Sequence, residues 1–479
     1  MGRLQPTNRH KTLNLSAFLS PKNLWPSLFA PVDIAILVYF RIVFGGIMLW
    51  EVWRYFDRGW IARYWIEPML NFPYVGFEWF HPLPGQGMYL HFWGLGTLAV
   101  FIVLGFWYRF STVLFFLGFT YIFLLEKARY LNHFYLICLI SFLLIFVPAH
   151  RAFSIDAWRR PGMRTQTAPA WALWLLRIQV GIPYFYGGLA KINSDWLQGE
   201  PMRMWMAART DFPVIGSFFT QEWMVYCLSY GGLLLDLLVV PFLFWRRSRP
   251  FAFMAALTFH LMNVRLFDIG IFPWFMIAAT ASFFDSDWPR RLVRLGLGGP
   301  PTASQKHLSN HHQAQPARLT PRHTLTLVLL GIYLALQLLL PFRHYLYPGN
   351  ANWTEEGHRF AWHMKLRSKD ADVRFVITNT LDGTVSYLDP YDILPRWQVR
   401  KMAARPDMIL QLSHIIAEDI GGADKDSIEV RAEAFASLNG REEQRLIDPM
   451  VDLSKERQSL APAQWILPLE VSLSERSID

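Results

Sequence analysis

The sequence has 479 residues, of which 53% are hydrophobic and 16% aromatic, and its formal net charge at pH 7 is +9. Long apolar runs separated by short basic loops predict a polytopic membrane protein and exclude a chain of ordinary soluble domains. Because the arginines are concentrated in particular loops, the positive charge does not indicate nucleic acid as a partner.

Nine segments approach the length of about 20 apolar residues that a membrane-spanning helix requires. We therefore predict a polytopic α-helical membrane protein of about nine spans, followed by an extracytoplasmic α+β domain. The predicted spans are residues 32–52, 88–107, 111–125, 131–148, 171–190, 223–245, 250–264, 268–284 and 324–342.

The distribution of basic residues predicts the orientation. They are in excess in the N-terminal segment and in the loops after the second, fourth, sixth and eighth spans, whereas acidic residues balance them in the alternate loops. By the positive-inside rule, the N-terminus is cytoplasmic and the C-terminal domain extracytoplasmic. The expected location is the lipid bilayer of a bacterial inner membrane, or of the endoplasmic reticulum in a eukaryote. The predicted domains are a cytoplasmic N-terminal segment (1–31), a helical domain with spans 1–8 (32–295), a flexible cytoplasmic linker (296–322), a ninth transmembrane helix (323–343) and the extracytoplasmic α+β domain (344–479).

The composition changes after the ninth span, where short strand and helix patterns replace the apolar runs. Residues 373–378 and 385–388 alternate apolar and polar side chains around Asp382-Gly383, which predicts a β-hairpin. Residues 396–419 have helical spacing interrupted at Pro406, and residues 428–435 predict a further strand.

Charged side chains inside membrane spans are costly, so they are expected to be paired or functional. Arg41, Arg177 and Asp236 are such residues. We predict that Asp236 pairs with Arg177 or Arg41 and locks two helices together. Six tryptophans predict an interfacial aromatic belt, with one or two of them as candidates to line a pocket. They are Trp50, Trp53, Trp60, Trp65, Trp79 and Trp93.

Lys191 ends the fifth predicted span, in a stretch that begins at Tyr184. Burial disfavours the ammonium form of a lysine, and a neutral amine is a usable general base. The alternative is a lysine with its stem in hydrocarbon and its head in water, and this stretch alone favours that alternative.

Other candidate residues lie on the same predicted side of the membrane as Lys191. They include two histidines and two amides near helix ends, and they lack paired carboxylates, a nucleophile elbow or the spacing of metal ligands. With an aromatic surround, this set suits an apolar, redox-active, proton-donating ligand such as a quinol, with no metal. The residues are Asn132, His133, His260, Asn263, Trp362 and Met364.

The sequence resembles the vitamin K-dependent γ-glutamyl carboxylase family and its bacterial membrane relatives. The resemblance runs from about residue 36 to residue 470, and its most specific motifs contain Lys191 and His133. The matching segments are GFWYRFS (105–111), FLLEK (123–127), NHFYL (132–136), YGGLAKINSDW (186–196), GGLLLD (231–236), FHLMN (259–263), DSDWP (285–289), NWTEEG (352–357), FAWHM (360–364) and RLIDPMVD (445–452).

The resemblance implies that Lys191 deprotonates vitamin K hydroquinone, a reduced phylloquinone or menaquinone, which then reacts with O2. The alkoxide formed on the way to the epoxide would take a γ-proton from a glutamyl side chain of a peptide or protein, and the carbanion would capture CO2. His133 matches the histidine associated with the carbanion, with Asn132 as an orienting donor. Trp362 and Met364 match a segment near the quinol site. The resemblance implies no metal.

The sequence departs from the family pattern in three ways. Both cysteines, Cys138 and Cys227, fall inside apolar runs, so none is available for the luminal disulfide of the family. Ala190 stands where the family motif has a second basic residue, and the animal enzymes continue into a longer β-rich luminal region. Two alternatives therefore stay open. One is a quinol-dependent membrane oxygenase or carboxylase with a non-protein substrate. The other is a non-catalytic membrane protein that binds quinone or lipid.

Overall fold

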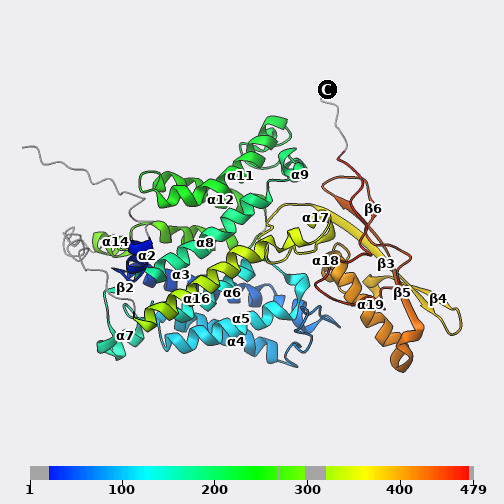
Figure 1. Cartoon of the computed structure of the whole chain (residues 1–479), viewed down its shortest axis with the longest axis horizontal. Coiled ribbons are helices and arrows are strands. Elements are labelled where there is room, and N and C mark those ends of the chain that lie inside the picture. Colours follow the sequence, from blue (N-terminus) through cyan, green and yellow to red (C-terminus); the bar gives the residue numbers. More distant parts are fainter. Residues whose placement is uncertain (1–20, 268, 297–319, 474–479) are drawn as a thin grey trace, which may run out of the picture.

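A computed structural model describes residues 21–267, 269–296 and 320–473 of the chain. Most of the predicted N-terminal segment and almost all of the predicted linker (296–322) lie outside these residues. The described chain forms a helical part and a strand-containing C-terminal domain, which lie side by side in Figure 1.

A helix overlaps each of the nine predicted spans, among the residues that the structure describes. Five of these helices, α3, α4, α5, α11 and α16 with its 3-10 extension, are long and apolar enough to cross a membrane. The chain is therefore a membrane protein, and the count of nine spans stays a prediction. The helices are α3 (Ala35–Asp57), α4 (Gly87–Leu104), α5 (Tyr108–Leu125), α6 (Asn132–Phe146), α8 (Ala170–Ala190), α11 (Glu222–Phe244), α12 (Arg249–Leu266), α13 (Phe272–Thr280) and α16 (Pro321–Leu339).

Shorter elements connect these helices. A two-stranded antiparallel pair joins β1 (Pro31–Asp33) to β2 (Thr167–Pro169), and Arg290 on α14 forms an ion pair with Asp33 at 3.0 Å. The remaining short helices are α2 (Pro21–Leu28), α7 (Ile155–Arg159), α9 (Ser194–Leu197), α10 (Met202–Ala207) and α14 (Trp288–Gly296).

The C-terminal domain is a four-stranded antiparallel sheet of order β4-β3-β5-β6. Its core buries Phe375 and Val430 of the sheet against Leu412 of α19. The predicted hairpin is confirmed, since Phe375 pairs with Leu388 and Thr378 with Val385 across the turn. The predicted helical break at Pro406 and the strand at 428–435 are also confirmed. The elements are α17 (Ala351–Thr354), β3 (Lys369–Asn379), β4 (Val385–Leu388), α18 (Arg396–Met402), α19 (Pro406–Gly421), β5 (Ile428–Leu438) and β6 (Gln444–Arg445).

Buried polar contacts join the C-terminal domain to the helical part. The Glu126 carboxylate, just after α5, accepts a hydrogen bond from Gln398 of α18 at 2.8 Å. The buried Lys127 forms an ion pair with Asp407 of α19 at 3.0 Å. Because buried polar groups must be hydrogen-bonded, these contacts fix how the two parts meet. The C-terminal domain therefore also contributes walls to the site described next.

Candidate functional site

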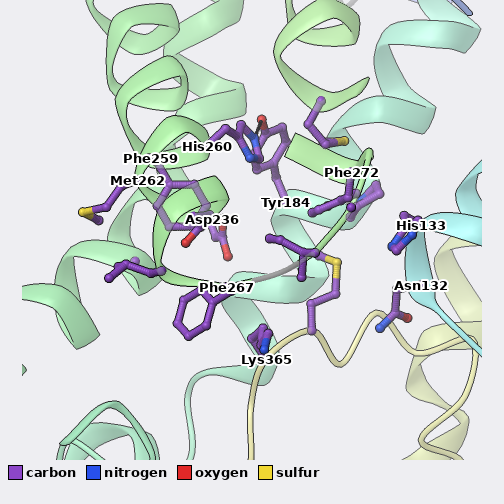
Figure 2. A pocket seen from close by; sticks show the side chains of 18 of the residues that line it. Asn132, His133, Tyr184, Asp236, Phe259, His260, Met262, Phe267, Phe272 and Lys365 are labelled. Carbon is purple, nitrogen blue, oxygen red and sulfur yellow. Dashed lines mark hydrogen bonds between the residues drawn. The ribbon is translucent and has the colours of Figure 1, made fainter. Parts of the chain in front are cut away.

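The helical part encloses a cavity of about 830 Å³. Its walls come from α8, α11, α12 and the starts of α6 and α13, and the C-terminal domain adds the segment around Met364. Figure 2 shows Asp236 and His260 at one side of this cavity and Asn132 and His133 at the other. Much of the lining is apolar and aromatic, as is typical of sites for small organic ligands. These apolar residues include Phe259, Met262, Phe267, Phe272 and Met276.

Lys191 and Asp236 form a buried ion pair in the wall of the cavity. The distance from Lys191 Nζ to Asp236 Oδ2 is 2.5 Å, and each side chain is 6% exposed. Lys191 Nζ also donates to the carbonyl oxygen of Gly187 at 3.2 Å and lies 5.2 Å from the ring centroid of Trp196. Lys191 is therefore buried and paired, and its head is not in water as the alternative interpretation required.

The glycines of the segment 186–196 allow this pair to form. A Cβ atom added to Gly188 would lie 2.9 Å from the backbone nitrogen of Leu237, and one added to Gly187 would lie 3.4 Å from Asp236 Oδ2. Helices α8 and α11 therefore approach closely at this point, as small residues permit in membrane helices. The close approach brings the carboxylate of α11 to the lysine at the end of α8.

The predicted pairing of Asp236 with Arg177 or Arg41 is wrong. Arg177 instead donates to the carbonyl oxygens of Ser282 and Phe284, both at 2.8 Å. Arg177 precedes Lys191 by 14 residues on α8, which corresponds to about 21 Å along the helix axis. Asp236 lies at the Lys191 end of α8, so Arg177 is out of its reach.

Arg41 has a similar environment. Its guanidinium donates to the carbonyl oxygens of Ala149 at 2.9 Å and Phe153 at 2.6 Å, in the loop that follows α6. Carbonyl groups beyond a helix end have no partner within the helix, so they can accept hydrogen bonds from the five donors of an arginine. Arg41 and Arg177 thus use backbone carbonyls where we expected a carboxylate.

Tyr184 and His260 lie next to the ion pair and hydrogen-bond to each other. The distance from the Tyr184 hydroxyl to His260 Nε2 is 2.7 Å, and the same hydroxyl lies 3.2 Å from Thr280 Oγ1. His260 Nδ1 is buried without a hydrogen-bond partner. Asn263, one helical turn after His260, also lines the cavity. This wall therefore offers polar groups that a ligand can use.

Asn132 and His133 form the opposite wall, at the start of α6. The Asn132 amide accepts a hydrogen bond from the Tyr130 hydroxyl at 3.0 Å and donates to the carbonyl oxygen of His363 at 2.9 Å. The His133 ring packs against Phe272, with 5.7 Å between the centroids. The C-terminal domain thus holds Asn132 in place beside His133.

Of the predicted substrate-binding residues, the structure places all but Trp362 in the cavity wall. Met364 lines the cavity, close to Gly187. Trp362, two residues earlier, is buried against Tyr135 with 4.9 Å between their centroids and does not line the cavity. The geometry assigns Trp362 to the packing between the two parts of the chain.

The sequence analysis did not identify a basic group of cavity residues. Arg54 and Arg129 line the wall near His133, together with Glu51, Trp60 and Tyr64. Arg54 follows the first predicted span, in a loop where acidic residues balance the basic ones, and Trp60 is one of the six tryptophans of which one or two were candidates to line a pocket. Their spacing gave no motif, because they come together only when the end of α3 meets the loop before α6.

No group of three or more His, Cys, Asp or Glu side chains is placed to hold a metal ion, within the part of the chain that the structure describes. The cavity instead combines an apolar surface with two buried ion pairs, Lys191–Asp236 and Arg54–Glu51, and several hydrogen-bonding groups. This combination fits an uncharged organic ligand that carries a hydroxyl group.

Two family models match the chain. Residues 29–288 match the HTTM domain. Residues 322–472 match the model described as vitamin K-dependent gamma-carboxylase, lumenal domain. No solved structure matches the chain.

Proposed function

Because the chain belongs to the vitamin K-dependent γ-glutamyl carboxylase family, we propose that it couples oxidation of vitamin K hydroquinone by O2 to addition of CO2 to a glutamyl side chain. The observation that carries this proposal is the Lys191–Asp236 ion pair in the wall of a large apolar cavity. The hydroquinone is a substrate of this reaction, and it supplies the electrons for O2 and the strong base for the glutamyl γ-carbon.

The cavity suits a ring with hydroxyl groups and an apolar tail. Its volume of about 830 Å³ lies in the range that holds ligands of this size. Phe259, Phe267 and Phe272 offer apolar surface, while the amide of Asn263 can hydrogen-bond to a hydroxyl group. Hydroquinone binding is therefore assigned to the wall that contains Tyr184, Lys191, Asp236, His260 and Asn263.

We assign the first proton transfer to Lys191 and Asp236 acting as one unit. In the resting pair the amine carries the proton and Asp236 is a carboxylate. Transfer of this proton to Asp236 leaves a neutral amine, which can take the proton of a substrate hydroxyl group. The pair then carries one positive charge beside the newly formed negative charge, and Coulomb attraction between the two stabilises the product of this step.

His133 and Asn132 are assigned to the glutamyl side of the reaction. His133 lies on the wall opposite Asp236 in Figure 2, so that two substrates can meet between the two walls. The hydrogen bonds of Asn132 to Tyr130 and His363 hold its amide in a fixed orientation. Fixed donors around a reacting group lower the barrier because they need no rearrangement during the reaction.

The test supplies reduced vitamin K, labelled bicarbonate and a glutamate-rich peptide to the purified protein, and measures both epoxide and labelled peptide. Lys191→Ala is expected to lower both by about 10²–10⁴-fold, the range typical of a general acid or base. His133→Ala is expected to lower carboxylation more than epoxide formation. Lys455→Ala, which removes an exposed lysine from the C-terminal domain, is the control and leaves both products unchanged.

Two results would overturn the proposal in different ways. Near-normal epoxide formation by Lys191→Ala would remove the lysine from the chemistry. If the wild type forms epoxide but no labelled peptide, the proposed quinol oxidation stands. The carboxylase function is then refuted in favour of the quinol-dependent oxygenase.

We further propose that the C-terminal domain is extracytoplasmic, as the basic loops predict. The exposed Ser386 on β4 provides a reporter position. In a Cys227→Ser background, Ser386→Cys is expected to react with an impermeant thiol reagent in intact right-side-out vesicles. Reaction only after permeabilisation would reverse the orientation.

A further inference from the structure

The cavity has a basic wall that the proposed proton transfer does not use. Arg54, near the end of α3, and Arg129, in the loop before α6, line this wall beside His133. Both guanidinium groups interact electrostatically with His133. The Lys191–Asp236 pair belongs to the other wall, so two kinds of charged group face the same cavity.

Arg129 has no carboxylate within ion-pair distance among the residues that the structure describes. Its guanidinium carbon lies 3.7 Å from the ring centroid of Tyr64, and its Nε is buried without a hydrogen-bond partner. Stacking on an aromatic ring holds the plane of a guanidinium but leaves its edge free to donate. The guanidinium also interacts with Tyr55, and its nitrogens that face the cavity keep donors for a ligand.

Arg54 forms an ion pair with a carboxylate on its own helix. Its Nη1 donates to Glu51 Oε2 at 2.6 Å, and both side chains are almost fully buried. The guanidinium carbon also lies 5.0 Å from the ring centroid of Trp60, another residue of the cavity wall. Tyr64 and Trp60 thus fix the orientation of the two guanidinium groups.

The three charged groups do not cancel. Arg54 and Arg129 contribute two positive charges and Glu51 one negative charge, which leaves one positive charge in a largely buried part of the wall. An unpaired charge in such a place is costly, and arginine binds carboxylates through two parallel hydrogen bonds. A ligand with a single negative charge would balance the set, whereas a doubly charged phosphate would exceed it.

We propose that Arg129 and Arg54 form a carboxylate-binding subsite that holds the acidic substrate beside His133. This inference rests on the proposed function, which requires a glutamyl side chain, and it names the residues that would recognise that side chain. The subsite explains how an apolar cavity admits a charged substrate, since the carboxylate would replace water by two guanidinium groups. It also places the acidic substrate on the wall opposite the Lys191–Asp236 pair.

The test is equilibrium dialysis of labelled N-acetylglutamate amide against the purified full-length protein, without hydroquinone, O2 or added CO2. Loss of a hydrogen bond to a charged group changes affinity by roughly tenfold to a hundredfold. Arg129→Gln is expected to lower the affinity for the probe by this factor, and Arg129→Lys is expected to lower it less. N-acetylglutamine amide is expected to bind the wild type at least tenfold more weakly than the acidic probe.

Arg63→Gln is the matched control. Arg63 is exposed, does not line the cavity, and stacks on the same Tyr64 ring at 5.6 Å. This variant keeps the affinity of the wild type if the subsite lies inside the cavity. Arg129→Gln is preferred to a change at Arg54, because it leaves the Arg54–Glu51 pair intact.

Three results would overturn the subsite: unchanged affinity in Arg129→Gln, equal weakening in Arg63→Gln, or equal binding of the two probes. A bicarbonate arm separates the other possible source of the anion. If millimolar bicarbonate displaces the labelled probe as well as the unlabelled probe does, the subsite binds bicarbonate.

The subsite and the proposed function can fail separately. If the protein forms epoxide but Arg129→Gln binds the probe as the wild type does, only the subsite is refuted. If binding of the probe depends on Arg129 but the protein shows no turnover, only the carboxylase function is refuted.

Discussion

Two buried ion pairs start from the same short segment, residues 191–196, and differ in how completely they are hydrogen-bonded. Lys191 meets Asp236 through a single contact of 2.5 Å in the cavity wall. Asp195, four residues later, receives two hydrogen bonds of 2.7 Å from Arg441 and one of 2.8 Å from Asn439 of the C-terminal domain. The side chains of both pairs are 6–8% exposed.

The difference separates a reactive pair from a structural one. Burial alone would raise the pKa of Asp195, but the hydrogen bonds from Arg441 and Asn439 outweigh it and hold that pKa below its ordinary value. Asp236, by contrast, has Lys191 as its one hydrogen-bond donor among the described residues. A carboxylate with unused capacity next to a cavity can accept a proton, whereas a saturated one fixes the position of the chain.

The largest effect is expected when the reactive pair is broken. Asp236→Ala strands the Lys191 ammonium in the helical part, and breaking a buried pair typically costs about 3–5 kcal/mol. Epoxide formation should also fall by about 10²–10⁴-fold, because the pair can no longer take up a proton. Thermal unfolding in detergent and the epoxide assay measure the two losses.

The double variant Lys191→Met/Asp236→Leu separates these two losses. Apolar side chains of similar size are expected to restore the unfolding temperature, because no charge is left unpaired. Epoxide formation should stay lost. A stable and active Asp236→Ala protein would show that the pair has neither role.

The structural pair is expected to affect stability more than chemistry. Arg441→Met leaves Asp195 buried without its bidentate partner, at a cost of about 3–5 kcal/mol in unfolding free energy. Epoxide formation by the protein that remains folded should fall less than in Asp236→Ala, because the Lys191–Asp236 pair stays intact. Thermal unfolding and epoxide assays on the same preparation measure the loss of stability and the loss of epoxide formation, which are then compared with those of Asp236→Ala.

The exposed pair of Arg374 and Glu433 on the sheet provides a control for this variant. Exposed pairs contribute about 0–1 kcal/mol, so Arg374→Met is expected to leave the unfolding temperature almost unchanged. Equal destabilisation by the two variants would mean that Arg441 acts as an ordinary surface charge.

Much of the fold follows from local patterns. The Asp382-Gly383 turn, the break at Pro406 and the strand at 428–435 were predicted because each depends on residues close in sequence. The number of membrane spans was harder to predict. Helices such as α6 and α13 are short, so length and hydropathy alone do not show whether they cross the bilayer.

Pairing inside the site could not be predicted to the same degree. The sequence shows that Asp236 and Arg177 lie in apolar helices, but the choice of partner depends on which end of α8 meets α11. That choice depends on Gly187 and Gly188, which allow close contact of the two helices near Lys191. Arg129 and Tyr64 are distant in sequence and come together only in the folded chain.

Close packing at the reactive pair provides a third, smaller prediction. A methyl group at Gly188 would lie 2.8 Å from the Leu237 side chain and 2.9 Å from its backbone nitrogen. Overpacking of this kind costs about 1–3 kcal/mol. Gly188→Ala should therefore lower the unfolding temperature and also weaken epoxide formation by separating Lys191 from Asp236.

Gly331→Ala on α16 is the matched control, because Gly331 does not line the cavity and a methyl group there would contact nothing within 4 Å. Alanine favours helices over glycine by roughly 1 kcal/mol, so this variant is expected to be neutral or slightly stabilising. If both alanine variants change the unfolding temperature in the same way, the change is due to helix propensity and not to close packing.

The smallest predicted effect lies in the segment that connects the C-terminal domain to Asn132. Burial, followed by the charges of His344 and Arg367, lowers the pKa of His363 from 6.5 to about 3. The unfolded chain therefore binds this proton below pH 6.5 while the folded protein does not until about pH 3. The free energy of unfolding is expected to fall as the pH drops through this window, by about 2 kcal/mol at pH 5.

Thermal unfolding between pH 5 and pH 7.5 measures this dependence. His363→Gln cannot take up the proton, so its unfolding temperature should fall less towards pH 5 than that of the wild type. His81→Gln, which changes an exposed histidine, should keep the slope of the wild type. An unchanged slope in His363→Gln would show that acid destabilises the protein elsewhere. A reduced slope would show that, unlike the Lys191–Asp236 pair, this connection depends on a buried group that stays uncharged.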